Sequence, residues 1–130
     1  MDEIVTDKIV RGQRWSAART LDDLGEGMFR RVRPQLGLTA FGMNVKVMQP
    51  GNSSKTHWHT EQEEIIFVHD GEITVVLGDD SLTELGPGAI VKIGPMQPHQ
   101  VFVTSDQPAI IVMMGGKDGV VEGDAEFAQA

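Results

Sequence analysis

The sequence contains no cysteine among its 130 residues. Disulfide bonds, thiol nucleophiles and thiolate metal ligands are therefore excluded, so any metal ion must be held by His, Asp or Glu. Long apolar runs are also missing, because no stretch approaches the ~20 residues that span a membrane. The first residues, MDEIVTDKIVRGQ, lack the basic start and apolar run of a signal peptide. We therefore expect a cytoplasmic protein that has no membrane partner.

Positive charge is scarce and unevenly placed. Eleven Lys and Arg residues stand against nineteen Asp and Glu residues, which gives a formal net charge of -8. Such a charge repels phosphate backbones and argues against nucleic acid as a partner. The segment RRVR at 30–33 could bind an anion, but we favour an arm laid against an acidic surface of its own or of a partner subunit. Seven of the eleven basic residues precede Pro34: Lys8, Arg11, Arg14, Arg19, Arg30, Arg31 and Arg33.

The apolar residues recur with a period of two, which is typical of β-strands rather than helices. Residues 38–48 alternate apolar with polar or small residues and predict a half-buried strand. Residues 64–78, EIIFVHDGEITVVLG, predict two strands that are buried on both faces and joined by a turn at Asp70-Gly71. Gly and Pro residues separate further predicted strands at 82–85, 89–93, 99–104 and 109–114.

One all-β domain is the expected organisation, since a chain of this length suits one compact core. We divide the chain into an N-terminal arm (1–34), a barrel domain (35–115) and a C-terminal segment (116–130). Only residues 16–31 could hold a short helix, with Ser16 as its cap, and two glycines weaken that prediction. The C-terminal segment lacks a sustained pattern and predicts either a tail or an added edge strand.

The segment HWHTEQEE at 57–64 concentrates residues that bind metals. Residues i and i+2 of a strand share a face, so His57 and His59 present two imidazoles side by side. Glu64 lies an odd number of residues from His59, so it joins them only if residues 60–62 turn or bulge. Beyond that turn Glu64 shares a face with Ile and Val residues, where a carboxylate is costly unless it is paired or bound to a cation.

A third imidazole comes from His99, which opens the predicted strand in QPHQVFV. Three neutral imidazoles and one carboxylate suit one divalent transition metal, and Fe, Mn, Ni, Zn, Co and Cu are all compatible with that donor set. The sequence therefore predicts a metal site at His57, His59, Glu64 and His99.

These residues resemble the cupins, a superfamily of small double-stranded β-helix barrels. The first cupin motif reads Gly, five residues, His-x-His, four residues, Glu, six residues, Gly. Every interval is kept by Gly51, His57, His59, Glu64 and Gly71. The resemblance covers roughly residues 38–115, and the HWH core is similar to that of small bacterial cupins.

The second cupin motif is matched only in part. Gly88 and His99 keep their spacing, whereas Gly94, Met96 and Val103 replace the usual Pro, Gly and Asn. The resemblance implies a jelly-roll type barrel with an N-terminal arm, in which His57, His59, Glu64 and His99 ligate one metal ion. The departures affect the turn before His99 more than its role as a ligand.

Other residues are assigned by strand parity. His69 lies an odd number of residues from Glu64 and is expected to face away from the site, in core or interface packing. The apolar face formed by Trp58, Phe67 and Phe102 is expected to pack on a second sheet or on another subunit, which predicts a homodimer. Core filling and the lining of a ligand pocket are alternative interpretations for an inward-facing set: Met43, Val45, Ile66, Val101 and Met113.

The expected function is that of a metal-dependent enzyme of the dioxygenase, isomerase or lyase type, acting on a small oxygenated or anionic molecule. Glu64 is a possible base. Lys46 and Lys92 alternate opposite to apolar neighbours and are expected to point away from the site. The lack of tyrosine and cysteine excludes cupin mechanisms that use an inner tyrosine or a cysteine crosslink. The alternative is a non-catalytic module that binds or senses a small molecule or the metal.

Overall fold

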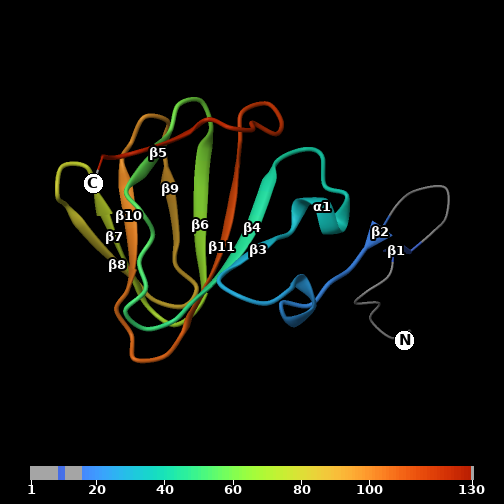
Figure 1. Ribbon diagram of the computed structural model, residues 1–130, viewed down its shortest axis with the longest axis horizontal. Coiled ribbons are helices and arrows are strands. Elements are labelled where there is room, and N and C mark those ends of the chain that lie inside the picture. The colour runs from blue at the N-terminus through green and yellow to red at the C-terminus, as the bar shows by residue number, and fades with distance from the viewer. Residues whose placement is uncertain (1–8, 11–15, 130) are drawn as a thin grey trace.

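The computed structural model describes Ile9–Val10 and residues 16–129. These residues include two antiparallel five-stranded sheets that face each other (Figure 1). The first sheet has the order β3-β4-β11-β6-β9 and the second the order β12-β5-β10-β7-β8. The strands of the first sheet are β3 (Phe29–Arg31), β4 (Gly42–Met48), β11 (Ala109–Gly116), β6 (Glu63–Asp70) and β9 (Ile90–Ile93). Those of the second are β12 (Ala125–Phe127), β5 (His57–His59), β10 (His99–Val103), β7 (Ile73–Leu77) and β8 (Leu82–Leu85).

The predicted strands and their turns are confirmed in the barrel. Every predicted segment from residue 38 to residue 114 contains a strand, with bounds that shift by a few residues. The turn between β6 and β7 is at Gly71, whose φ of 74° favours glycine. A Cβ atom there would lie 2.5 Å from the carbonyl oxygen of Pro108, so the close approach of that loop also requires glycine. None of the described helices is long and apolar enough to cross a membrane.

The core lies between the two sheets, where every second residue of each strand points inward. Along β10 the burial alternates strictly, with His99, Val101 and Val103 buried and the residues between them half-buried. The burial of these apolar side chains is the main source of stability, at about 25 cal/mol for each Å² removed from water. The buried core residues are Met48, Ile66, Val68, Ile73, Val75, Ile93, Val101, Val103, Ala109, Ile111 and Met113.

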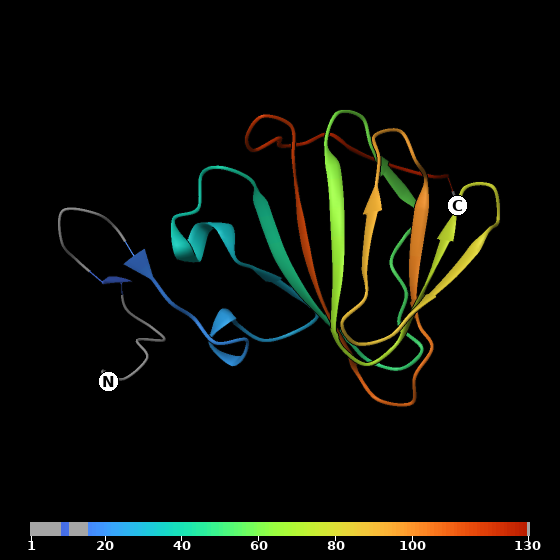
Figure 2. The same cartoon turned by 180° about the vertical axis from the view of Figure 1, so that it is seen from behind.

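The described part of the N-terminal segment packs on the outer face of β4 and β11 (Figure 2). Leu24 and Val32 pack against Val45 of β4 in a second buried cluster, so this contact is apolar. Among the described residues, Glu122 is the one acid that pairs with the RRVR segment, through Arg33. Lys8, Arg11 and Arg14 lie outside the described residues.

The helix predicted within residues 16–31 is wrong in its type and in its cap. Ser16 lies in the short strand β2 (Ser16–Ala17), which pairs with β1 (Ile9–Val10). The helical part of the segment is limited to the 3-10 turn η1 (Asp22–Leu24). The α-helix of one turn, α1 (Arg33–Leu36), follows it. The sequence contains two signals of this helix. Pro34 stands in its first turn, and Gly37 ends it in a left-handed conformation.

The predicted orientation of β4 is also wrong. Val45 packs under the N-terminal segment on the outer face, so the residues that alternate with it, Asn44 and Lys46, are on the inner face. Alternation identified an apolar face, but both faces of β4 are covered, and the apolar one lies outside. Similarly, β6 is not buried on both faces, since its alternate residues Glu63, Ile65 and His69 are exposed.

Candidate metal centre

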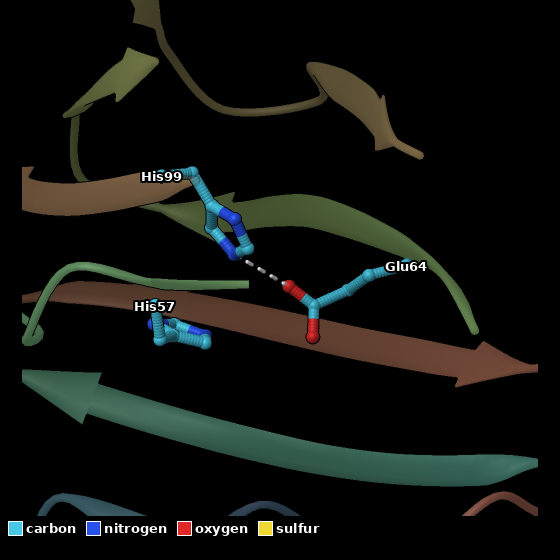
Figure 3. A group of neighbouring side chains, drawn as sticks. All are labelled: His57, Glu64 and His99. Atoms are coloured by element: carbon cyan, nitrogen blue, oxygen red, sulfur yellow. Dashed lines mark ion pairs between the residues drawn. The ribbon is translucent and has the colours of Figure 1, made fainter. Parts of the chain in front are cut away.

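Three strands bring the predicted ligands together at one end of the barrel. His57 and His59 come from β5, and His99 on the neighbouring strand β10 lies directly opposite His57. Glu64 comes from β6 in the facing sheet. The turn expected at residues 60–62 separates β5 from β6, and it places Glu64 on the inner face. Figure 3 shows the side chains of His57, Glu64 and His99 converging from these separate strands.

The carboxylate of Glu64 lies at the centre of the cluster. Its Oε1 is 3.3 Å from Nε2 of His99, and its Oε2 is 3.3 Å from Nε2 of His59. Ligand atoms of His57, Glu64 and His99 lie within 4.8 Å of one another, a spacing that one ion could bridge. His59 is outside that group of three but adjoins it through Glu64.

The second ring nitrogen of each histidine contacts an oxygen acceptor. Nδ1 of His57 is 2.8 Å from the carbonyl oxygen of Lys55, and Nδ1 of His99 is 2.9 Å from that of Gln97. Nδ1 of His59 is 3.0 Å from Oδ1 of Asp124. A carbonyl oxygen or a carboxylate can only accept, so each Nδ1 carries the proton when the ring is neutral. The lone pair is then on Nε2, which is the atom that points into the cluster.

These Nε2 atoms fit a metal ion. Those of His59 and His99 are buried, and neither makes a hydrogen bond of acceptable geometry within the described part of the chain. Buried polar atoms without partners are rare in folded proteins and call for an explanation. A cation in contact with both nitrogens and with Glu64 would satisfy all of them, and neutral imidazoles with a carboxylate are a common donor set for divalent transition metals.

The charges of the cluster favour an ionised carboxylate. Burial alone would raise the pKa of Glu64, but the contacts with His59 and His99 lower it to about 2. Burial lowers the pKa of His57 and favours its neutral, metal-binding form. The contact with Glu64 raises the pKa of His59, against the opposite effect of burial. Without a metal, Glu64 is therefore paired with histidines rather than isolated on an apolar face.

Asp124 is a site residue that sequence reasoning missed. It is buried, at 8% exposure, although it belongs to the C-terminal segment. Besides His59 Nδ1, it accepts hydrogen bonds from the backbone N–H groups of Glu61 and Gln62 and from the Gln62 side chain. Burial raises its pKa, but the hydrogen bonds from Gln62 and Glu61 lower it to about 2. An ionised Asp124 thus fixes both the orientation of His59 and the 60–62 turn.

The C-terminal segment is an added edge strand rather than a loose tail. It crosses the end of the barrel that holds the cluster (Figure 1), and β12 pairs with β5. Ala125 and Phe127 lie opposite His59 and His57 in that pairing. The ring of Phe127 is 5.6 Å from the ring of His57, so the segment also forms part of the wall of the site.

A cavity of about 770 Å³ opens over the cluster. Its lining includes His57, His59 and Glu64 together with Lys46 of β4, so the expectation that Lys46 points away from the site is wrong. Burial lowers the pKa of Lys46, and the charge of Glu64 opposes that shift. Further polar lining residues are Arg31, Arg33, Asn44, Ser53, Ser54, Lys55, Gln62 and Glu122.

The five residues predicted to line a pocket and His69 lie in different parts of the barrel. Met43 and Met113 line the cavity. Ile66 and Val101 belong to the inner core and Val45 belongs to the outer cluster, and these three are not among the lining residues. His69 is exposed on the outer face, as its parity predicts, and not in the core.

The comparisons with known proteins agree with this fold. Residues 44–115 match the model of the cupin domain family. No curated protein sequence is significantly similar to the chain. A barrel protein of the cupin 2 type from Salinispora arenicola has a similar structure, with 25% identity and a TM-score of 0.66 over 76% of this chain and 87% of that one.

Two enzymes of larger size are also similar. A sugar phosphate isomerase of the cupin superfamily from Silicibacter pomeroyi shares 25% identity, with a TM-score of 0.65 over 78% of this chain. The DMSP lyase DddQ from Ruegeria pomeroyi shares 25% identity, with a TM-score of 0.59 over 68% of this chain. The chain spans only 65% of the first protein and 43% of the second. Because the family match covers more than half of the sequence and the fold agrees with it, this chain belongs to the cupin domain family.

Proposed function

We propose that this protein is a metal-dependent enzyme acting on a small oxygenated, anionic metabolite. The observation that carries the proposal is the convergence of buried Nε2 atoms without hydrogen bonds on an ionised glutamate, over an open cavity. A barrel that needed only stability would favour apolar residues at these positions, because buried ionic clusters add little to stability compared with apolar packing.

His57, His59, Glu64 and His99 would hold the ion through three nitrogens and a carboxylate. When bound, a divalent ion supplies Lewis acidity that polarises an oxygen of the substrate. Asp124 keeps His59 in the tautomer that offers Nε2, and the Lys55 and Gln97 carbonyls do the same for His57 and His99. Met113 and Phe127 are apolar parts of the cavity wall.

Two groups at the site are candidates for proton transfer, Glu64 and Lys46. A general base works best when its pKa is near the working pH. Glu64, with a pKa of about 2, is ionised at neutral pH but weakly basic, so it suits the role of ligand better than that of base. Lys46 lines the same cavity and has a lowered pKa, which gives the chain a second group able to exchange a proton near the substrate.

The reaction type is proposed from the structural relatives. One of them is a sugar phosphate isomerase and another a DMSP lyase, and both have a similar barrel. We therefore place isomerase and lyase chemistry before the dioxygenase type. The alternative function is a binding or sensing module, in which the same cluster and cavity hold a ligand without converting it.

The test begins with protein purified without a histidine tag. Elemental analysis should find one transition metal ion per chain. The metal-loaded protein is then screened against hydroxy acids, keto acids and sugar phosphates, under air and under nitrogen. Turnover under nitrogen supports the isomerase or lyase type, and oxygen consumption supports the dioxygenase type. Tight binding of a screened compound with no turnover under either gas would favour the sensing module, and absence of metal would contradict the proposal.

A homodimer is part of the same proposal. The outer face of β6 and β9 exposes apolar side chains, with Ile65 at 38% and Ile90 at 65% exposure, and Phe67 lies opposite Ile90. Exposed apolar surface of this kind is typical of contacts between subunits. Light scattering at low micromolar concentration should give twice the chain mass of 14.2 kDa. A mass of one chain would contradict the dimer and leave the metal centre unaffected.

A further inference from the structure

The inner face of β3 and β4 carries a polar group of residues at the side of the cavity. Lys46 and Asn44 are two residues apart on β4 and share that face. In the antiparallel pairing with β3, Arg31 lies opposite Asn44 and Phe29 lies opposite Lys46. All four side chains line the cavity that also contains His57 and Glu64.

This group has positive charge that the protein does not neutralise. Within the described residues, neither Lys46 nor Arg31 has a carboxylate at ion-pair distance, although acids outnumber bases in the sequence. The cavity acids are already paired, since Glu64 contacts His59 and His99, and Glu122 pairs with Arg33. Two cations on diagonally adjacent positions repel each other, so a counter-charge from outside the chain is favoured.

The environment of Lys46 makes this position unusual for a surface lysine. Its side chain is half-buried, beside the fully buried Ile111 on the next strand. Its Nζ lies 6.0 Å from the centre of the Phe29 ring. Burial without a paired acid lowers the pKa of Lys46, and a bound anion would reverse that shift. Asn44 adds an amide that, in the described part of the chain, makes no side-chain hydrogen bond and is available as a donor.

We propose that Lys46, Arg31 and Asn44 form a subsite that binds an anionic group, a carboxylate or a phosphate, of the substrate. The inference rests on the proposed function, because the remainder of the substrate would face the metal centre, of which His57 and Glu64 line the same cavity. The substrate is then a small molecule with an anionic group at one end and a reacting oxygen at the other. The subsite orients the reacting end, which is a recognised source of rate enhancement.

The experiment measures anion binding directly, with inorganic phosphate and malonate as the charged probes and malonamide as the neutral one. Calorimetric titrations are run on chelator-treated protein and on zinc-loaded protein. Lys46→Met and Arg31→Gln should each weaken binding of the better anion by about tenfold or more, because each removes a charged hydrogen-bond donor. Lys92→Gln is the matched control, since Lys92 is exposed and pairs with Glu63 outside the cavity.

The outcomes separate this subsite from the metal proposal. Anion binding that depends on Lys46 and Arg31 in chelator-treated protein supports the subsite, even if the protein never binds a metal. Preference for phosphate or for malonate decides between the two anionic groups. Anion binding that occurs only with zinc and is unchanged in both variants would overturn the subsite and leave the metal centre standing. Equal binding of malonamide and malonate would also overturn it. Melting temperatures within a few degrees of wild type verify that the variants fold.

Discussion

The two ends of the barrel have opposite chemistry, although the same strands and the same inner faces build both. On β6 the inward residues change from Glu64 to Val68, and on β10 they change from His99 to Val103. The inward residues of β4 likewise change from polar to apolar, from Lys46 to Met48. The residues at one end are apolar and buried, while at the other end Glu64 and Lys46 line a cavity of about 770 Å³ and His99 is buried against Glu64. The apolar end holds the sheets together, and the polar end is free to serve a ligand.

The largest expected effect comes from the polar end. His57→Ala combined with His59→Ala should abolish metal binding, because it removes two nitrogen ligands from one ion. Elemental analysis of the variant after exposure to excess metal and desalting measures the effect. His69→Ala is the control, since His69 is exposed on the outer face of β6 and should leave the metal content unchanged. A double variant that keeps full stoichiometric metal would refute the assignment of these ligands.

The apolar end should respond in the opposite way. Ile111 is fully buried between the sheets, so Ile111→Ala should lower the free energy of unfolding by about 2–5 kcal/mol. Its metal content, measured on the folded protein, should stay at one ion per chain. Leu82→Ala, at a position that is 67% exposed, should change stability by less than about 0.5 kcal/mol. If Ile111→Ala instead abolished metal binding in folded protein, the two ends would not be independent.

Removal of the metal should lower the stability of the whole barrel, by an amount that depends on pH. An ion at about 100 times its dissociation constant adds about 2.7 kcal/mol to the free energy of unfolding. A chelator should therefore lower the melting temperature at pH 7.5. The difference should shrink towards pH 5, because protons compete for the imidazoles and the pKa of His59 is raised by Glu64. Calorimetric scans of metal-loaded and chelated protein test this, and equal melting temperatures at pH 7.5 would contradict it.

The pKa shifts also define the behaviour of the metal-free protein. The folded pKa of His59 is raised, so its pairing with Glu64 stabilises the fold at low pH and is lost as the pH rises through that pKa. The folded pKa of Glu64 is lowered to about 2, so its contribution is present above the unfolded value of 4.5 and is lost as the pH falls towards 2. Between pH 4.5 and the raised pKa of His59, a protonated His59 pairs with the ionised Glu64 and partly replaces the metal ion. This pairing is a second reason for the smaller chelator effect at pH 5.

A smaller effect is expected outside the ligand set. Asp124→Asn removes the charge that holds Nδ1 of His59 and should weaken metal affinity by roughly 10- to 100-fold. Competition with a fluorescent zinc chelator measures that affinity. Asp106→Asn, at an exposed acid in the loop before β11, is the matched control and should leave affinity unchanged. An unchanged affinity in Asp124→Asn would show that the C-terminal segment covers the site without positioning it.

The sequence predicted that His57, His59 and Glu64 lie together, because the signal is local. The spacing of His57 and His59, and the parity of Glu64 with the expected turn, are properties of one short segment. Asp124 had no such signal, because it lies 65 residues from His59 along the chain. The two side chains meet only because β12 pairs with β5. Lys46 was predicted on the wrong face of β4, because the alternation of apolar residues does not tell which face of a strand is inside. The apolar face of β4 is the outer one, which the N-terminal segment covers.

The most direct test of the central claim is an anomalous difference map from crystals of metal-loaded protein, recorded at the absorption edge of the bound metal. We expect one peak per chain, in contact with Nε2 of His57, His59 and His99 and with the carboxylate of Glu64, at about 2.0–2.2 Å if the ion is zinc. Coordination through Nε2 is required, because each Nδ1 is committed to an oxygen acceptor. A peak elsewhere, or coordination through Nδ1, would contradict the account.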